Sequence, residues 1–142
     1  GTLLGAGDVI CLSGDLGAGK TALTKGIAEG WGALELVTSP TFTLIHEHRR
    51  AQDNQVLYHI DSYRLEGAAD AWGIGLEDML YGDQVVVIEW PEKIEAALPA
   101  ERLWIALSIE GDSQRRLLFT ATGDRYQQLL EMLQHEPKLG AK

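Results

Sequence analysis

The chain has 142 residues, 45% of them hydrophobic, and a formal net charge of −9 that arises from 21 acidic and 12 basic residues. This length and apolar content suffice for one globular domain with a substantial core. The acidic balance argues against broad, non-specific binding of nucleic acid, because such binding needs a cationic face.

Composition also bears on the compartment and on the extent of the domain. No apolar stretch approaches the ~20 residues of a membrane-spanning helix, and no signal-peptide pattern is present. The single cysteine, Cys11, excludes an intrachain disulfide, so we expect a reducing, cytoplasmic location. The chain begins without a Met shortly before its first predicted strand, and we expect a truncated N-terminal lead-in. One domain is expected over residues 1–135, followed by a frayed tail at residues 136–142.

The first predicted strand, residues 8–13, leads directly into the sequence GDLGAGKT at residues 14–21. The spacing G-x-x-x-x-G-K-[ST] is that of a phosphate-binding loop, or Walker A motif. Its glycines let the backbone approach a phosphate closely, and the N–H groups of the loop and of the following helix converge on the phosphate oxygens. Lys20 places a positive charge near the β- and γ-phosphates, and the Thr21 hydroxyl is a hard oxygen ligand suited to Mg²⁺.

The remaining elements follow the loop in chain order. The helix that the motif requires is predicted over residues 22–28 and ends near Gly30 and Gly32. Apolar runs predict further strands at residues 41–46, 56–61, 84–90, 103–109 and 115–122. Shorter helices are predicted at residues 76–80 and 91–98, and a closing helix at residues 124–133.

The strand patterns predict the architecture. The β-branched run at residues 84–90 is typical of a central parallel strand that is covered on both faces. Turn residues at 110–113 join the last two strands into a predicted hairpin. We therefore expect an α/β fold, a P-loop NTPase three-layer sandwich. Its central sheet would be mixed and mainly parallel, with an antiparallel C-terminal hairpin.

Two carboxylates come at the ends of apolar strands, where open α/β sheets bind their ligands. Glu89 ends the apolar run at residues 85–88, in the position where P-loop proteins keep the acid that organises Mg²⁺. Asp61 ends the strand at residues 56–61. The plainer interpretation of each is a strand-end carboxylate that caps the next element.

Two polar segments remain open to interpretation. Residues 39–43, SPTFT, occupy the place of a switch segment, in which a threonine senses γ-phosphate and Mg²⁺. A proline-containing turn that leads into a strand explains them equally well. Residues 46–48, HEH, suggest a metal site, but no third ligand follows in register, which favours a solvated strand end.

Four blocks occur together in one order: GDLGAGKT at residues 14–21, SPTFT at 39–43, HIDSYR at 59–64 and IEWP at 88–91. With these blocks the chain resembles the TsaE (YjeE) family of small bacterial P-loop ATPases. The resemblance implies ATP hydrolysis in support of a TsaB–TsaD complex. That complex makes the threonylcarbamoyl modification of adenosine beside the tRNA anticodon, so this chain would need no broad nucleic-acid-binding face of its own.

The resemblance also implies roles for individual residues. Lys20 and Thr21 would bind phosphate and Mg²⁺, Glu89 would help to hold the metal, and Asp61 would lie in the catalytic shell. Thr43 would belong to a switch-like region, and Trp90 would lie beside the nucleotide. The predicted catalytic residues are Lys20, Asp61 and Glu89, and the predicted metal ligands are Thr21 and Glu89. The predicted ATP-binding residues are Asp15, Leu16, Gly17, Ala18, Gly19, Lys20, Thr21, Ala22, Thr43 and Trp90.

Two other functions use the same loop. A small-molecule kinase would transfer the γ-phosphate to a metabolite, although such enzymes usually carry an arginine-rich lid. The arginine doublets here are Arg49-Arg50 and Arg115-Arg116, and the second lies in a predicted hairpin strand. A nucleotide-dependent binding switch would use hydrolysis to reset a contact with a partner protein.

Overall fold

The computed structural model describes residues 1–15, 17–34 and 45–135. In these residues a six-stranded sheet has the order β2-β3-β4-β1-β5-β6. Its strands are β1 (Val9–Ser13), β2 (Ile45–Arg49), β3 (Val56–Asp61), β4 (Val85–Glu89), β5 (Arg102–Glu110) and β6 (Gln114–Thr122). The four inner strands are parallel, and β2 and β6 are antiparallel to their neighbours. The mixed, mainly parallel sheet with an antiparallel hairpin at its C-terminal end is confirmed.

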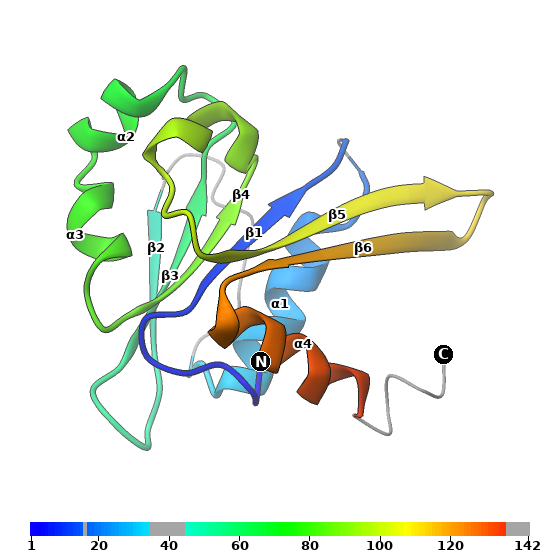
Figure 1. Cartoon of the computed structure of the whole chain (residues 1–142), viewed down its shortest axis with the longest axis horizontal. Helices are drawn as coiled ribbons and strands as arrows, with labels where there is room; N and C mark the ends of the chain where they lie inside the picture. Colours follow the sequence, from blue (N-terminus) through cyan, green and yellow to red (C-terminus); the bar gives the residue numbers. More distant parts are fainter. Residues whose placement is uncertain (16, 35–44, 136–142) are drawn as a thin grey trace.

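Helices cover both faces of the sheet (Figure 1). One face carries α1 (Lys20–Trp31) and α4 (Asp124–Gln134). The other face carries α2 (Ala68–Gly73), α3 (Leu76–Leu80) and the 3₁₀ helix η1 (Pro91–Ala97). The molecule is therefore a three-layer sandwich, as the sequence predicts.

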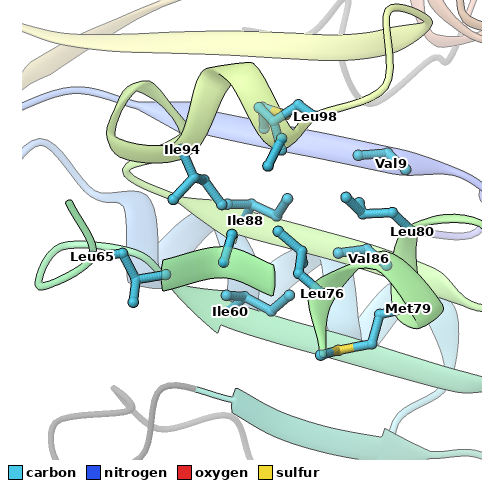
Figure 2. Packing of buried hydrophobic residues seen from close by; sticks show 13 residues of the cluster. Val9, Ile60, Leu65, Leu76, Met79, Leu80, Val86, Ile88, Ile94 and Leu98 are labelled. Carbon is cyan, nitrogen blue, oxygen red and sulfur yellow. The ribbon is translucent and has the colours of Figure 1, made fainter. Parts of the chain in front are cut away.

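Side chains of β1 alternate between two hydrophobic clusters, one on each face. Val9 and Cys11 point into the cluster beneath α2, α3 and η1, and Ile10 and Leu12 point into the cluster beneath α1 and α4. Figure 2 shows part of the first cluster, with Ile88 of β4 beside residues of α3 and η1. Because side chains of a strand alternate between the two faces, the cluster that one residue joins shows which face each other residue of that strand occupies. This assigns the polar residues at the strand ends to a face as well.

Strand β4 is buried along its whole length, which confirms the prediction of a central parallel strand covered on both faces. It pairs in parallel with β3 on one side and with β1 on the other. Because β3, β4 and β1 are parallel neighbours, their carboxyl ends meet at one edge of the sheet (Figure 1).

Several boundaries differ from the sequence prediction. Helix α1 begins at Lys20 rather than at residue 22, and it ends as expected at Gly32, whose φ is 108° and whose N–H donates to the carbonyl of Ala28. Strand β2 continues to Arg49 because its pairing with β3 extends to Val56, beyond the residues whose alternation was visible in sequence. Residues 41–44 of the predicted strand lie outside the described residues, as does the predicted tail at 136–142.

None of the helices in the described part of the chain is both long and apolar enough to cross a membrane.

Cys11 should react with thiol reagents only after unfolding. The side chain is 0% exposed, and burial raises the pKa of its thiol to about 12. Because the thiolate is the nucleophile, labelling by a disulfide reagent at pH 8 should be roughly 1,000-fold slower in the folded protein than in urea. The two rates are measured by absorbance of the released thiolate. Rates that agree within tenfold would contradict the buried placement of Cys11.

Candidate nucleotide site

The loop between β1 and α1 has the backbone that its glycines permit. Gly14, Gly17 and Gly19 have φ values of 147°, 81° and 106°, which residues with a side chain rarely adopt. A Cβ on Gly14 would also lie 2.5 Å from the carbonyl oxygen of Leu107 on β5. Gly14 is therefore required both by its conformation and by the close approach of β5.

The loop opens onto the N-terminus of α1. Gly19 is the N-cap residue, and in the described part of the chain no side chain caps this end and no acidic residue lies in the first turn. The first N–H groups of a helix have no partner within the helix, and the helix dipole makes this end positive. A twelve-residue helix with an uncapped N-terminus at a glycine loop is suited to bind an anion such as phosphate.

Lys20 lies across the loop with its ammonium group already surrounded. Nζ donates hydrogen bonds to the carbonyl oxygens of Gly14 and of Asp15, the latter at 2.9 Å. The same Nζ lies 4.1 Å from the centroid of the Trp90 ring. Lys20 is 5% exposed, and this burial lowers the pKa of its ammonium group, while the nearby Glu89 carboxylate acts in the opposite direction. Phosphate oxygens would supply the compensating charge that the buried ammonium lacks.

Glu89 ends β4 beneath the first turn of α1 and is 4% exposed. The Thr21 hydroxyl donates to Oε1 of this carboxylate at 3.3 Å. Nε2 of His59, on β3, contacts Oε2. Thr21 and Glu89 therefore form a pair of hard oxygen donors, as Mg²⁺ prefers. Among the described residues no group of three or more His, Cys, Asp or Glu could hold a metal. Phosphate and water oxygens would have to complete a magnesium site here.

Asp61 is the register partner of Glu89 on the adjacent parallel strand β3. Residues paired in this way point to the same face, so both carboxylates lie on the side of α1. Oδ1 of Asp61 accepts the backbone N–H of Tyr63 at 2.9 Å. This bond closes a turn directly after β3 and does not cap α2, which begins at Ala68. Among the described residues no hydrogen bond to the second oxygen of Asp61 is present.

Trp90 has a φ of 59°, and among the described residues it is the one non-glycine residue with a positive φ. Its N–H donates to the carbonyl of Leu12, which extends the β4–β1 pairing by one step before the chain turns into η1. The indole ring contacts both the Lys20 ammonium and the ring of Tyr63, whose centroid is 4.9 Å away. Trp90 therefore covers the loop lysine.

The structure brings most of the predicted site together and leaves two residues unplaced. Lys20 and Thr21 from α1, Asp61 from β3, and Glu89 and Trp90 from the end of β4 meet at one edge of the sheet. The loop positions Asp15, Gly17, Ala18, Gly19 and Ala22 flank them. Leu16 and Thr43 lie outside the described residues, so their predicted contacts with a nucleotide remain predictions.

Sequence reasoning overlooked two residues that contact the candidate site, and it was wrong about the burial of a histidine on β2. His59 and Tyr63 entered only as parts of the block at residues 59–64, although His59 shares the face of Asp61 at a spacing of two. That spacing was the available signal. The solvated strand end expected at residues 46–48 is wrong for His48, which is buried, because β2 places it opposite Leu57 over the α1 face of the sheet.

Comparisons with known proteins agree on one family. A family model described as "Threonylcarbamoyl adenosine biosynthesis protein TsaE" matches residues 1–117. The chain is 48% identical to the tRNA threonylcarbamoyladenosine biosynthesis protein TsaE of Bacillus subtilis, over 89% of this chain and 78% of that protein. It is 41% identical to the protein of that name from Streptomyces coelicolor, over 87% and 86% of the two chains.

A solved structure supports the same conclusion. The crystal structure of YdiB from Bacillus subtilis superposes with a TM-score of 0.77 at 42% sequence identity, over 94% of this chain and 80% of that one. The family model covers most of the sequence, including the loop and both strand-end carboxylates. The chain belongs to the TsaE family.

Proposed function

We propose that this chain is a Mg²⁺-dependent ATP-binding and ATP-hydrolysing accessory protein for threonylcarbamoyladenosine modification of tRNA, acting on a TsaB–TsaD complex in the cytoplasm. A single P-loop ATPase domain over residues 1–135 would carry the activity. The observation on which the proposal rests is the meeting of Lys20 and Thr21, from the loop helix, with the carboxylates of Asp61 and Glu89 from two neighbouring strand ends.

The donor set fits a magnesium ion that arrives with a nucleotide. Thr21 Oγ1 and the buried Glu89 carboxylate would hold the ion, because both are hard oxygen donors and they lie 3.3 Å apart. When bound, Mg²⁺ would neutralise charge on the β- and γ-phosphate oxygens.

The protein's own groups would bind the phosphates and orient the attacking water. The N–H groups at the start of α1 and the Lys20 ammonium would hold the phosphates and stabilise the charge on the transferred group. The free oxygen of Asp61 would accept a hydrogen bond from the attacking water and orient it in line with the γ-phosphorus. The sequence has no arginine finger in a recognisable position, so we expect slow turnover until a partner adds positive charge.

The charge balance supports a role through a partner protein. With a net charge of −9 the chain is poorly suited to bind the negatively charged phosphate backbone of tRNA, so a separate complex would hold the tRNA. The relatives named for tRNA threonylcarbamoyladenosine biosynthesis, together with the family model, support the assignment to this pathway.

The test measures phosphate release from ATP with the chain alone, with a TsaB–TsaD complex, and with each in EDTA. We expect slow, Mg²⁺-dependent release by the chain alone and stimulation of at least about tenfold by the complex. Release that needs no Mg²⁺, or that the complex leaves unchanged, would contradict the proposal. ADP formed in a one-to-one ratio with a phosphorylated metabolite would show a kinase instead. Binding of the complex with ATP but not with ADP, without turnover, would indicate a switch.

A further inference from the structure

Glu89 is held from two sides by residues of different elements. Thr21 of α1 donates to Oε1 at 3.3 Å, and Nε2 of His59 contacts Oε2. An ionised carboxylate only accepts hydrogen bonds, so in the proposed arrangement Nε2 would carry the hydrogen and donate it. The Thr21 hydroxyl also lies 3.5 Å from Oε2, so it is close to both oxygens, whereas the His59 contact is to Oε2 and leaves Oε1 open to a further partner.

The sheet register explains how His59 reaches this carboxylate. His59 is paired with Val87 on β4, and Glu89 follows two residues later on the same face. The imidazole therefore extends diagonally across the pair of strands to the strand end. The ring of His46, on β2, packs edge-on against it with centroids 6.2 Å apart, which limits its rotation.

A role in core packing alone does not account for a histidine at this position. His59 is 0% exposed, and Nδ1 has no hydrogen-bond partner among the described residues. A buried polar atom without a partner opposes folding, whereas the same face of β3 carries an apolar residue at Leu57. The hydrogen bond of this buried histidine goes to Glu89.

We propose that His59 is a positioning residue that fixes the Glu89 carboxylate for Mg²⁺. Its Nε2–H holds Oε2, so that Oε1 and the Thr21 hydroxyl oxygen present a preset pair of ligands to the ion that accompanies the nucleotide. Ligands oriented by an outer hydrogen bond bind metal more tightly, because they lose less freedom on binding. The inference rests on the proposed function, since it needs a magnesium ion at Glu89.

The test compares His59→Gln with His59→Asn. The glutamine amide nitrogen takes the place of Nε2 and can still reach Glu89, whereas the asparagine amide nitrogen takes the place of Nδ1 and cannot. Val87→Ala is the control, because it removes buried atoms at the register partner of His59 without touching Glu89. For each protein, calorimetry gives the affinity for a non-hydrolysable ATP analogue in Mg²⁺ and in EDTA, and thermal unfolding gives the stability.

We expect His59→Asn to raise the Mg²⁺ concentration needed for half-maximal analogue binding by about 10- to 100-fold and to leave binding in EDTA unchanged. His59→Gln should stay within about threefold of the wild type. Val87→Ala should lower the unfolding temperature without moving the Mg²⁺ midpoint. The inference is overturned if Asn and Gln behave alike, if binding in EDTA falls equally, or if Val87→Ala shifts the midpoint as much as Asn does. A wild-type protein without any Mg²⁺ effect would overturn the proposed function together with the inference.

Discussion

Lys20→Ala is expected to abolish measurable ATP hydrolysis and to weaken ATP binding by roughly 10- to 100-fold, the cost of removing a charge-assisted hydrogen bond to phosphate. The rate should fall by about 10³-fold, because Lys20 would stabilise charge that develops during transfer of the γ-phosphate. Phosphate release and calorimetric titration with ATP measure the two effects.

The same substitution should not destabilise the fold. Burial lowers the pKa of Lys20, which means that the folded state disfavours the charged form of this side chain relative to the unfolded state. Removing the ammonium therefore relieves a cost, although it leaves the carbonyls of Gly14 and Asp15 without their donor. We expect an unfolding temperature equal to or above that of the wild type.

Lys25→Ala is the matched control, because Lys25 is an exposed lysine on the same helix. It should bind and hydrolyse ATP as the wild type does. Hydrolysis by Lys20→Ala at the wild-type rate would contradict the role given to the loop lysine. A large fall in its unfolding temperature would instead show that the ammonium holds the loop together in the absence of nucleotide.

The sequence was sufficient to predict the parts of the candidate site that depend on local pattern. The loop is recognisable because a strand, a glycine-rich turn and a helix occur in one continuous stretch. Asp61 and Glu89 were found because each ends an apolar strand, and parallel strands bring such ends to one edge. Predicting these two carboxylates needed only the parallel arrangement of the strands and no knowledge of which distant residues pair.

Contacts that depend on register and backbone conformation were not accessible in this way. His59 meets Glu89 diagonally across β3 and β4, and a sequence does not state which residues of two strands face one another. Trp90 precedes Pro91, a position that favours extended backbone, yet it adopts a φ of 59° because the chain must leave β4 and enter η1 within one residue. That turn is what brings its indole over Lys20.

The structure also shows why the two carboxylates should be distinguishable by substitution. Glu89 is buried and contacts Thr21 and His59, whereas Asp61 is less buried and uses one oxygen to cap Tyr63. These surroundings suit Glu89 as a fixed ligand of a metal ion and Asp61 as a group that meets solvent. The two residues are neighbours on adjacent strands, so if only their negative charge mattered, neutralising either one would have a similar effect on ATP binding and hydrolysis.

Glu89→Gln and Asp61→Asn, which keep the shape of each side chain, are therefore expected to fail at different steps. Glu89→Gln should remove most of the Mg²⁺-dependent gain in affinity for an ATP analogue and, with it, hydrolysis. Asp61→Asn should retain this gain and lose about 10²- to 10⁴-fold in the rate of hydrolysis, as expected for a group that orients or deprotonates water. Calorimetry in Mg²⁺ and in EDTA, together with single-turnover phosphate release, separates the two effects.

Glu92→Gln supplies the control for charge. Glu92 is exposed on η1 and, like Glu89 and Asp61, raises the pKa of Lys20, so its loss removes one nearby negative charge without removing a group from the site. It should leave both the Mg²⁺ effect and the rate within about twofold of the wild type, because exposed charges act weakly through solvent. If Asp61→Asn loses the Mg²⁺-dependent affinity and Glu89→Gln keeps it, the two roles are exchanged. If all three variants change alike, the field at Lys20 matters more than the position of either carboxylate.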